Sequence, residues 1–184
     1  LYVDAGNSKS YPGSGTSWAD LTLNTSAGAM SNTTFSSGEM VFAGIGGGVN
    51  SSVTFADQTY IRSSGTYTFS VWVNPGDNLT NGAGTIFHGG PSLNNERNGM
   101  HVAGAGSTVS AAFGYYNGTS WFNVYAYLPK NQWSNLVGVN NAGTLSLYQN
   151  GISSTSSGGG LYVGSAGGLH IGWSSVAADP RYFE

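Results

Sequence analysis

Short runs of alternating apolar and polar residues recur along this 184-residue chain, and clusters of Gly, Asn and Ser separate one run from the next. Alternation with a period of two is the pattern of a half-buried β-strand, and no stretch shows the helical period of about 3.6 residues. In the clearest run, TYTFSVWVNP, the apolar side chains of Tyr67, Phe69, Val71 and Val73 share one face. The sequence therefore predicts an all-β chain.

Further segments with this pattern are predicted to be strands. They are 1–3, 40–42, 52–55, 84–88, 99–103, 109–115, 121–127, 134–140, 144–149 and 169–172. The stretch from Asn140 to Gly143 predicts a tight hairpin, and Asn150-Gly151 closes the next strand with residues that tolerate positive φ. The run SSTSSGGG at 153–160 predicts a flexible surface loop.

Charge is scarce in this chain, with 7% charged residues, five Lys and Arg in total and a net charge of −3. No basic patch is available to neutralise phosphates or anionic lipid, so neither nucleic acid nor a membrane surface is expected as a partner. Eight Phe, eleven Tyr and five Trp supply a core, which distinguishes the chain from disordered Gly- and Ser-rich sequences. A polar, uncharged surface of this kind is typical of extracellular, cell-surface or virion proteins.

Three segments, YTFSVWVNP, NQWSNLVGVNNAGTLSLYQNGI and GGLHIGWSS, resemble in order and spacing the strands of laminin G-like, concanavalin A-like lectin/glucanase domains. The resemblance implies a two-sheet antiparallel jelly-roll sandwich that forms a single domain over residues 1–184. The opening DAGN…SYPGSG…W.DL is similar to the start of such domains in virion and tail proteins of tailed bacteriophages. In that arrangement Trp18 and Leu21 pin the opening loop to the core, and Asp4 and Asp20 hydrogen-bond its backbone.

The end of the chain departs from the family pattern. After Arg181 to Phe183 the family continues into a last strand that pairs beside the first one, whereas this sequence stops at Glu184. A first strand at 1–3 would then lie on an unprotected edge. Either the missing strand lies beyond the given sequence, or a neighbouring chain supplies it by strand addition.

Catalytic patterns are weak. Hydrolysis of a glycosidic bond needs two carboxyl groups that flank the bond, and no two of the eight acids form such a pair on one strand. The acids are Asp4, Asp20, Glu39, Asp57, Asp77, Glu96, Asp179 and Glu184. The three histidines, His88, His101 and His170, fit polar positions of sheet faces better than a metal site. The sequence therefore predicts a protein that is not an enzyme, with glycoside hydrolysis as the least favoured alternative.

No cofactor is expected, but calcium is a candidate because relatives in the family bind it through loop oxygens. Its candidate ligands are Asp77, Asn78, Asn95 and Glu96, and ordinary turn chemistry accounts for the same residues.

The candidate ligand-binding residues are Tyr116, Asn117 and Trp121, which surround an Asn-Gly turn and combine aromatic faces with an amide. The alternative is that these aromatic residues belong to the core or form cross-strand pairs. The leading hypothesis is a non-catalytic virion structural or decoration domain that contacts other virion or surface chains, including copies of itself. The alternative is a lectin-like module that binds host glycans.

Overall fold

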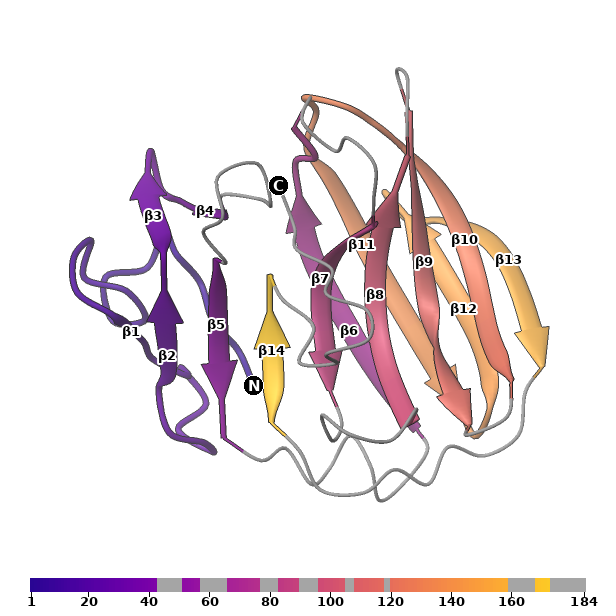
Figure 1. Cartoon of the computed structure of the whole chain (residues 1–184), viewed down its shortest axis with the longest axis horizontal. Coiled ribbons are helices and arrows are strands. Elements are labelled where there is room, and N and C mark those ends of the chain that lie inside the picture. Colours follow the sequence, from indigo (N-terminus) through magenta and orange to yellow (C-terminus); the bar gives the residue numbers. More distant parts are fainter. Residues whose placement is uncertain are drawn as a thin grey trace.

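The computed structural model of the chain describes residues 1–42, 51–56, 66–76, 83–89, 96–104, 108–117, 120–158 and 168–172. Within these ranges the chain forms antiparallel strands and no helix. The strands build two packed sheets and one small hairpin (Figure 1). The predicted all-β, two-sheet antiparallel sandwich is therefore confirmed.

The larger sheet contains eight strands among the described residues and runs from the opening segment on the left to β10 on the right in Figure 1. In spatial order these are β1 (Ser17–Trp18), β2 (Gly28–Ser31), β5 (Ser52–Phe55), β14 (Leu169–Ile171), β7 (Ala83–Gly89), β8 (Glu96–Ala103), β9 (Thr108–Asn117) and β10 (Trp121–Pro129). The late strand β14 thus lies between two early ones.

The smaller sheet contains four strands in the described part of the chain and lies behind the larger one in Figure 1. In spatial order these are β13 (Ile152–Gly158), β12 (Thr144–Gln149), β11 (Ser134–Asn141) and β6 (Thr66–Val73). The hairpin consists of β3 (Thr33–Ser36) and β4 (Glu39–Phe42). Strand β13 also contacts β10, so the two sheets meet along that edge.

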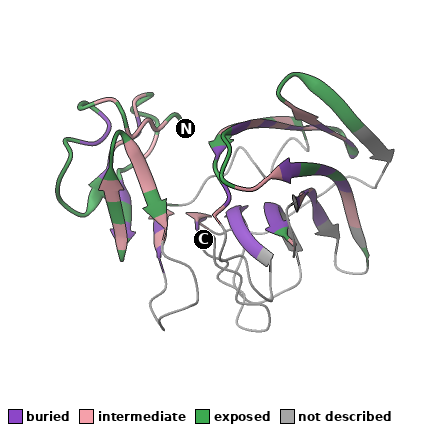
Figure 2. Cartoon of the chain, turned by 90° about the horizontal axis from the view of Figure 1, so that it is seen from above, coloured by how far each residue is buried: buried purple, intermediate pink, exposed green. Residues whose placement is uncertain are grey.

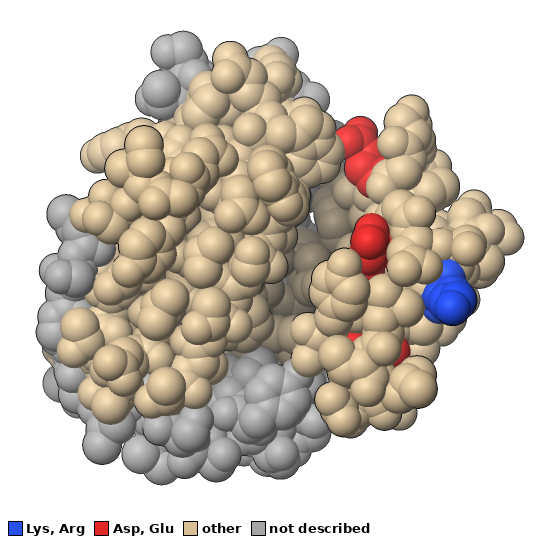
Figure 3. All heavy atoms as spheres, turned by 180° about the vertical axis from the view of Figure 1, so that it is seen from behind, with Lys and Arg blue, Asp and Glu red and all other residues tan. Residues whose placement is uncertain are grey.

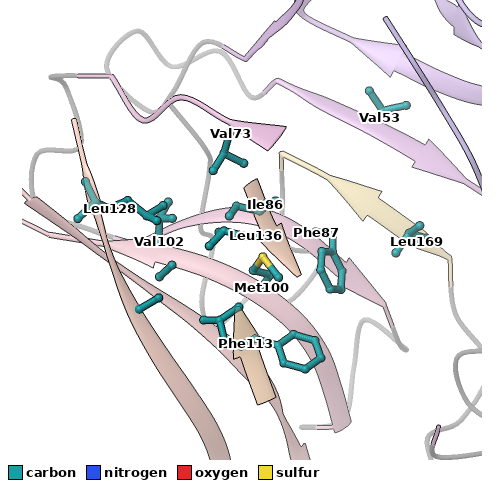
Figure 4. Close-up of a cluster of buried hydrophobic side chains, with 14 of the residues drawn as sticks. Val53, Val73, Ile86, Phe87, Met100, Val102, Phe113, Leu128, Leu136 and Leu169 are labelled. Atoms are coloured by element: carbon teal, nitrogen blue, oxygen red, sulfur yellow. The ribbon is translucent and has the colours of Figure 1, made fainter. Parts of the chain in front are cut away.

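The core lies between the two sheets, and Figure 2 shows buried stretches in the strands of both sheets. Phe69 of the small sheet stacks on Phe87 of the large sheet, with ring centroids 3.7 Å apart. Tyr67 meets Phe113 edge to face at 6.2 Å. Aliphatic side chains from both sheets fill the space around these rings, among them Val73, Ile86, Met100, Val102, Leu128, Leu136 and Leu169 (Figure 4).

The strand phases and turns follow the sequence closely. The apolar residues of TYTFSVWV turn inward as predicted, whereas Trp72 is exposed. Ala142 and Gly143, with φ of 49° and 97°, form the predicted tight hairpin between β11 and β12. Asn150 and Gly151, with φ of 50° and 81°, turn the chain back again. Both pairs have the positive φ at two successive residues that a type I′ turn requires.

Residues 153–158 correct one prediction, because they belong to β13 and pair with β12 instead of forming a surface loop. The Asn150-Gly151 turn returns the chain directly beside β12, so the backbone of this Ser-rich segment continues the ladder. Its polar side chains are tolerated there because Ser153 and Ser154 are exposed at the edge of the sheet.

The opening segment corrects a second prediction, because residues 1–3 do not form a strand. The Tyr2 N–H donates to the Asp20 carboxylate at 2.9 Å, and the Leu21 N–H donates to the Tyr2 carbonyl at 2.8 Å. The loop's own far end therefore satisfies the backbone N–H and carbonyl of Tyr2. The origin of the family's last strand, further along the chain or from a neighbouring chain, stays a prediction, because residues 173–184 lie outside the described residues.

The opening loop is held as the resemblance implied. Trp18 is buried in the core, and Leu21 is half-buried. Asp4 accepts a hydrogen bond from the Gly6 N–H at 2.9 Å. Asp20 is only 3% exposed, and besides the Tyr2 N–H it accepts the Thr22 N–H and hydroxyl at 3.0 and 2.7 Å and the Asn24 N–H at 3.2 Å.

We expect Gly138→Ala to lower the free energy of unfolding by about 1–3 kcal/mol, because it overpacks the space between the sheets. A Cβ on Gly138 would lie 2.6 Å from ring carbons of Phe113. That ring is fully buried, so it cannot move aside cheaply. Chemical denaturation measures the change. Gly76→Ala is the control, since a Cβ there meets nothing within 4 Å; equal stability of the two variants would contradict the packing argument.

Asp20→Asn should lower the free energy of unfolding by about 2 kcal/mol at neutral pH. Burial alone would raise the pKa of the Asp20 carboxyl, but hydrogen bonds from Tyr2 and Thr22 lower the pKa to about 2. Because this pKa is lower in the folded than in the unfolded chain, the ionised Asp20 carboxylate stabilises the folded state at neutral pH. This stabilisation is lost as pH falls from about 4 to about 2.

Denaturation of the parent and of Asp20→Asn at neutral pH and near pH 3 tests this expectation. The difference between the two proteins should shrink at the lower pH. Asp4→Asn serves as control, since the Asp4 carboxylate receives the Gly6 N–H in an exposed setting. A difference between parent and Asp20→Asn that does not change with pH would contradict the assignment.

Candidate binding surface

Strand β10 presents two tyrosines on the outer face of the eight-stranded sheet. Its inward residues Val124, Ala126 and Leu128 are buried, while Tyr125 and Tyr127, which alternate with them, are 49% and 71% exposed. Alternation along the strand therefore places both phenol rings on the face directed away from the core.

The residues beside these tyrosines are small. Tyr125 pairs with Ala112 and Tyr127 with Ser110 on β9, and Ser110 pairs in turn with Ala103 on β8. No long side chain on these neighbouring positions rises beside the rings, so the tyrosines stand above a shallow floor. We name Tyr125, Tyr127, Ser110, Ala112 and Ala103 the tyrosine strip.

Polar side chains continue this outer face toward the middle of the sheet. A Cβ on Gly114 would collide with the Asn123 side chain, and one on Gly99 would lie 2.6 Å from Nε2 of His101. The two glycines pair with each other across β8 and β9. Because neither carries a side chain, Asn123 and His101 can lie flat across the sheet.

The three histidines lie on this same outer face, on adjacent strands. His88 of β7 pairs with His170 of β14, with ring centroids 6.5 Å apart. His170 Nδ1 lies 3.1 Å from the Thr54 hydroxyl, and His101 Nδ1 lies 3.4 Å from the Thr85 hydroxyl. In the described part of the chain, no three His, Asp or Glu side chains are arranged to hold a metal ion.

The predicted ligand residues lie at the far end of the β9–β10 hairpin. Tyr116 and Trp121 are direct partners in its register, and Asn117 pairs with Glu96 of β8. Phe113 and Tyr115 face inward, as that prediction required. The register thus brings Tyr116 and Trp121 together on the two strands that carry the tyrosine strip. Of the calcium candidates, Asp77, Asn78 and Asn95 lie outside the described residues.

Sequence reasoning missed Tyr125, Tyr127 and Asn123. The signal was present in WFNVYAYLP, where every second residue from Phe122 to Leu128 is apolar and the positions between them are Asn123, Tyr125 and Tyr127. The prediction stopped at the turn residues because both phases of this strand contain aromatic side chains.

The carboxylates of Asp4 and Asp20 stabilise the fold. Asp4 and Asp20 both accept backbone hydrogen bonds within the opening loop. A general acid for glycoside hydrolysis needs a raised pKa, and the pKa of Asp20 is lowered to about 2. Asp20 therefore does not fit that role. Over the described residues, no helix is long and apolar enough to cross a membrane.

Residues 46–184 match the family model of the concanavalin A-like lectin/glucanases superfamily, so the chain belongs to this superfamily. The match covers most of both sheets described above and begins after the opening loop. Comparison with curated proteins gave no significant match.

Several solved structures share the fold. Domain 4 of AbnA, a GH43 extracellular arabinanase from Geobacillus stearothermophilus solved with arabinotriose, has a TM-score of 0.64 at 20% identity, with 89% of this chain and 81% of that chain covered. Botulinum neurotoxin type C has a TM-score of 0.58 at 12% identity, covering 86% of this chain and 39% of that one. Tailspike protein 2 of bacteriophage CBA120 has a TM-score of 0.50 at 10% identity, covering 90% and 25%. This chain therefore spans less than half of the neurotoxin and tailspike chains.

We expect His170 to make the free energy of unfolding depend on pH. Burial lowers the pKa of His170, so the unfolded chain takes up a proton at a higher pH than the folded chain. Stability should therefore fall as pH falls through about 6.5, and His170→Gln should weaken this dependence. Urea denaturation between about pH 7.5 and pH 5 measures it. Parallel pH profiles for the parent and the variant would show that His170 does not contribute.

Proposed function

We propose that this domain is a non-catalytic carbohydrate-binding module that recognises glycans on an extracellular or virion surface. The observation that carries the proposal is the tyrosine strip, which presents two exposed rings above a floor of small residues. A sugar ring has one face of C–H groups that packs on an aromatic ring, and its hydroxyls need hydrogen-bonding partners nearby.

The surroundings of the strip favour a neutral sugar. Strands β9 and β10 contain no Asp, Glu, Lys or Arg, and the charged residues of β8, Glu96 and Arg97, pair with Asn117 and Tyr116 at the far end of the hairpin, away from Tyr125 and Tyr127. Ser110 and Asn123 lie on the same face and supply a hydroxyl and an amide for sugar hydroxyls. Tyr116 and Trp121, partners at the end of the same hairpin, are in the strand phases of Ser110 and Tyr125 and extend the proposed site along the direction of the strands; Asn117 follows Tyr116 at the end of β9.

The structural neighbours support a saccharide as the ligand, and the arabinotriose among them supports a neutral one. The arabinanase domain was solved with arabinotriose, and botulinum neurotoxin type C interacts with two ganglioside molecules. The phage tailspike supports a place on a virus particle, where the domain would also contact neighbouring virion chains or other copies of itself. Glycan recognition takes precedence over assembly in this proposal, because residues 1–3 do not form the open edge strand that favoured assembly.

Native affinity electrophoresis tests the proposal directly. The parent protein should migrate more slowly in gels that contain at least one neutral polysaccharide from a set of arabinan, galactomannan and xyloglucan. The double variant Tyr125→Ala, Tyr127→Ala should lose about tenfold or more in affinity, because each ring contributes both buried area and stacking.

Tyr2→Ala is the matched control, since Tyr2 is 55% exposed and lies on the opening segment, away from β10. It should bind as the parent does. Binding that survives in the double variant would contradict the placement of the site, and release of reducing sugar by the parent would contradict the non-catalytic assignment.

A further inference from the structure

The outer face of the four-stranded sheet carries a second pair of exposed aromatic residues. Trp72 of β6 is 64% exposed, and Trp133, directly before β11, is 48% exposed. Trp72 pairs with Asn135 in the register of the two strands. Ser134, between Trp133 and Asn135, is fully buried, so Trp133 lies on the outer side. The two indoles are therefore diagonal neighbours, at a Cα spacing of about 7–8 Å.

Two side-chain amides lie beside these indoles in fixed positions. The Asn150 carboxamide oxygen accepts the Asn135 backbone N–H at 2.9 Å. The Asn135 carboxamide nitrogen donates to the Val71 carbonyl at 3.2 Å. The NH₂ of Asn150 and the carboxamide oxygen of Asn135 are the groups that remain for a hydroxyl of a ligand. Because the amides are already anchored, binding would cost little additional side-chain entropy.

The whole sheet is uncharged. None of the strands β6, β11, β12 and β13 contains Asp, Glu, Lys or Arg. Figure 3 shows this side of the molecule, where the visible acidic and basic side chains lie over the opening part of the chain and a broad uncharged surface lies beside it. Beyond the indoles, the next row across the sheet is Ser70, Val137, Tyr148 and Ser153.

We propose that Trp72, Trp133, Asn135 and Asn150 form a second saccharide site, which binds an extended chain of neutral sugar units. An anionic polysaccharide or a phosphate-bearing surface would find no Lys or Arg in the four strands of this face. A neutral sugar chain needs none, and it matches what the face offers: aromatic rings for C–H surfaces, and amides and hydroxyls for its own hydroxyls.

This site is independent of the tyrosine strip. The two faces lie on opposite sides of the core and share no residue. A domain with both sites would hold two polysaccharide chains, or one chain that wraps around it, with an affinity above that of either site alone.

Affinity electrophoresis in arabinan, galactomannan and xyloglucan gels, with dextran sulfate as the anionic probe, tests the second site. The double variant Trp72→Ala, Trp133→Ala should lose roughly tenfold in affinity for at least one neutral polysaccharide. The variant Trp72→Phe, Trp133→Phe should retain most of that affinity, because phenylalanine keeps an aromatic face. Ile152→Ala is the matched control, since Ile152 is 75% exposed at the edge of the same sheet.

Two results would overturn this inference. One is that the tryptophan double variant, with an unchanged melting temperature, binds every neutral polysaccharide as the parent does. The other is that the parent forms a dimer in light scattering that the tryptophan variant does not, which would identify the face as a protein contact. If the tyrosine variant loses all binding and the tryptophan variant binds as the parent does, the second site is wrong and the proposed function stands. If the tryptophan variant loses all binding and the tyrosine variant binds as the parent does, the tyrosine strip is wrong and the second site stands.

Discussion

The close approach of the two sheets at Phe113 and Gly138 is the contact on which the rest of the structure depends. The ring of Phe113 occupies the space that any side chain at position 138 would fill. The stacking of Phe69 on Phe87 is a second close contact between the two sheets. Once these inward positions are set, alternation determines every outward one, including Tyr125 and Tyr127 on one side and Trp72 on the other. The interior therefore sets which chemistry each outer surface presents.

The opening loop is part of the sandwich, although the family match begins only at residue 46. Trp18 and Met30 belong to the same core as the later strands, and β1 and β2 extend the large sheet. The Asp20 carboxylate replaces a regular strand by collecting backbone donors from both ends of the loop. A buried charge is stable here because its oxygens accept several hydrogen bonds.

Sequence reasoning succeeded wherever a strand had one apolar phase and a turn with a specific backbone requirement. The strands 52–55 and 144–149 were predicted with their observed bounds. Sequence reasoning failed where contacts with distant parts of the chain, and not the local alternation of apolar and polar residues, determine the structure. The short strands β2 and β3 have too few apolar residues to be recognised, and β13 is held by its neighbour β12 and not by its own composition.

The candidate surface was predicted only in part for a related reason. The sequence indicated the β9–β10 hairpin, and the register confirms that Tyr116 and Trp121 are partners. It could not separate Phe122, which packs on the core, from Tyr125, which is exposed, because aromatic residues occupy both phases of the strand. Only the inward positions of Val124 and Leu128 decide between them. Exposed aromatic residues can therefore be identified only after the inward-facing positions of the strand are known.

The position of β14 has a consequence for how this chain folds. Strand β14 joins β5 to β7, and its His170 contacts Thr54 from 116 residues away in the sequence. Because pairing over so long a sequence separation is entropically costly, we expect this junction to form late in folding. Until it forms, the early strands β1, β2 and β5 have no backbone pairing with the rest of the large sheet. During synthesis, the first part of the chain must therefore wait, incompletely paired, until almost the last described residues have been made.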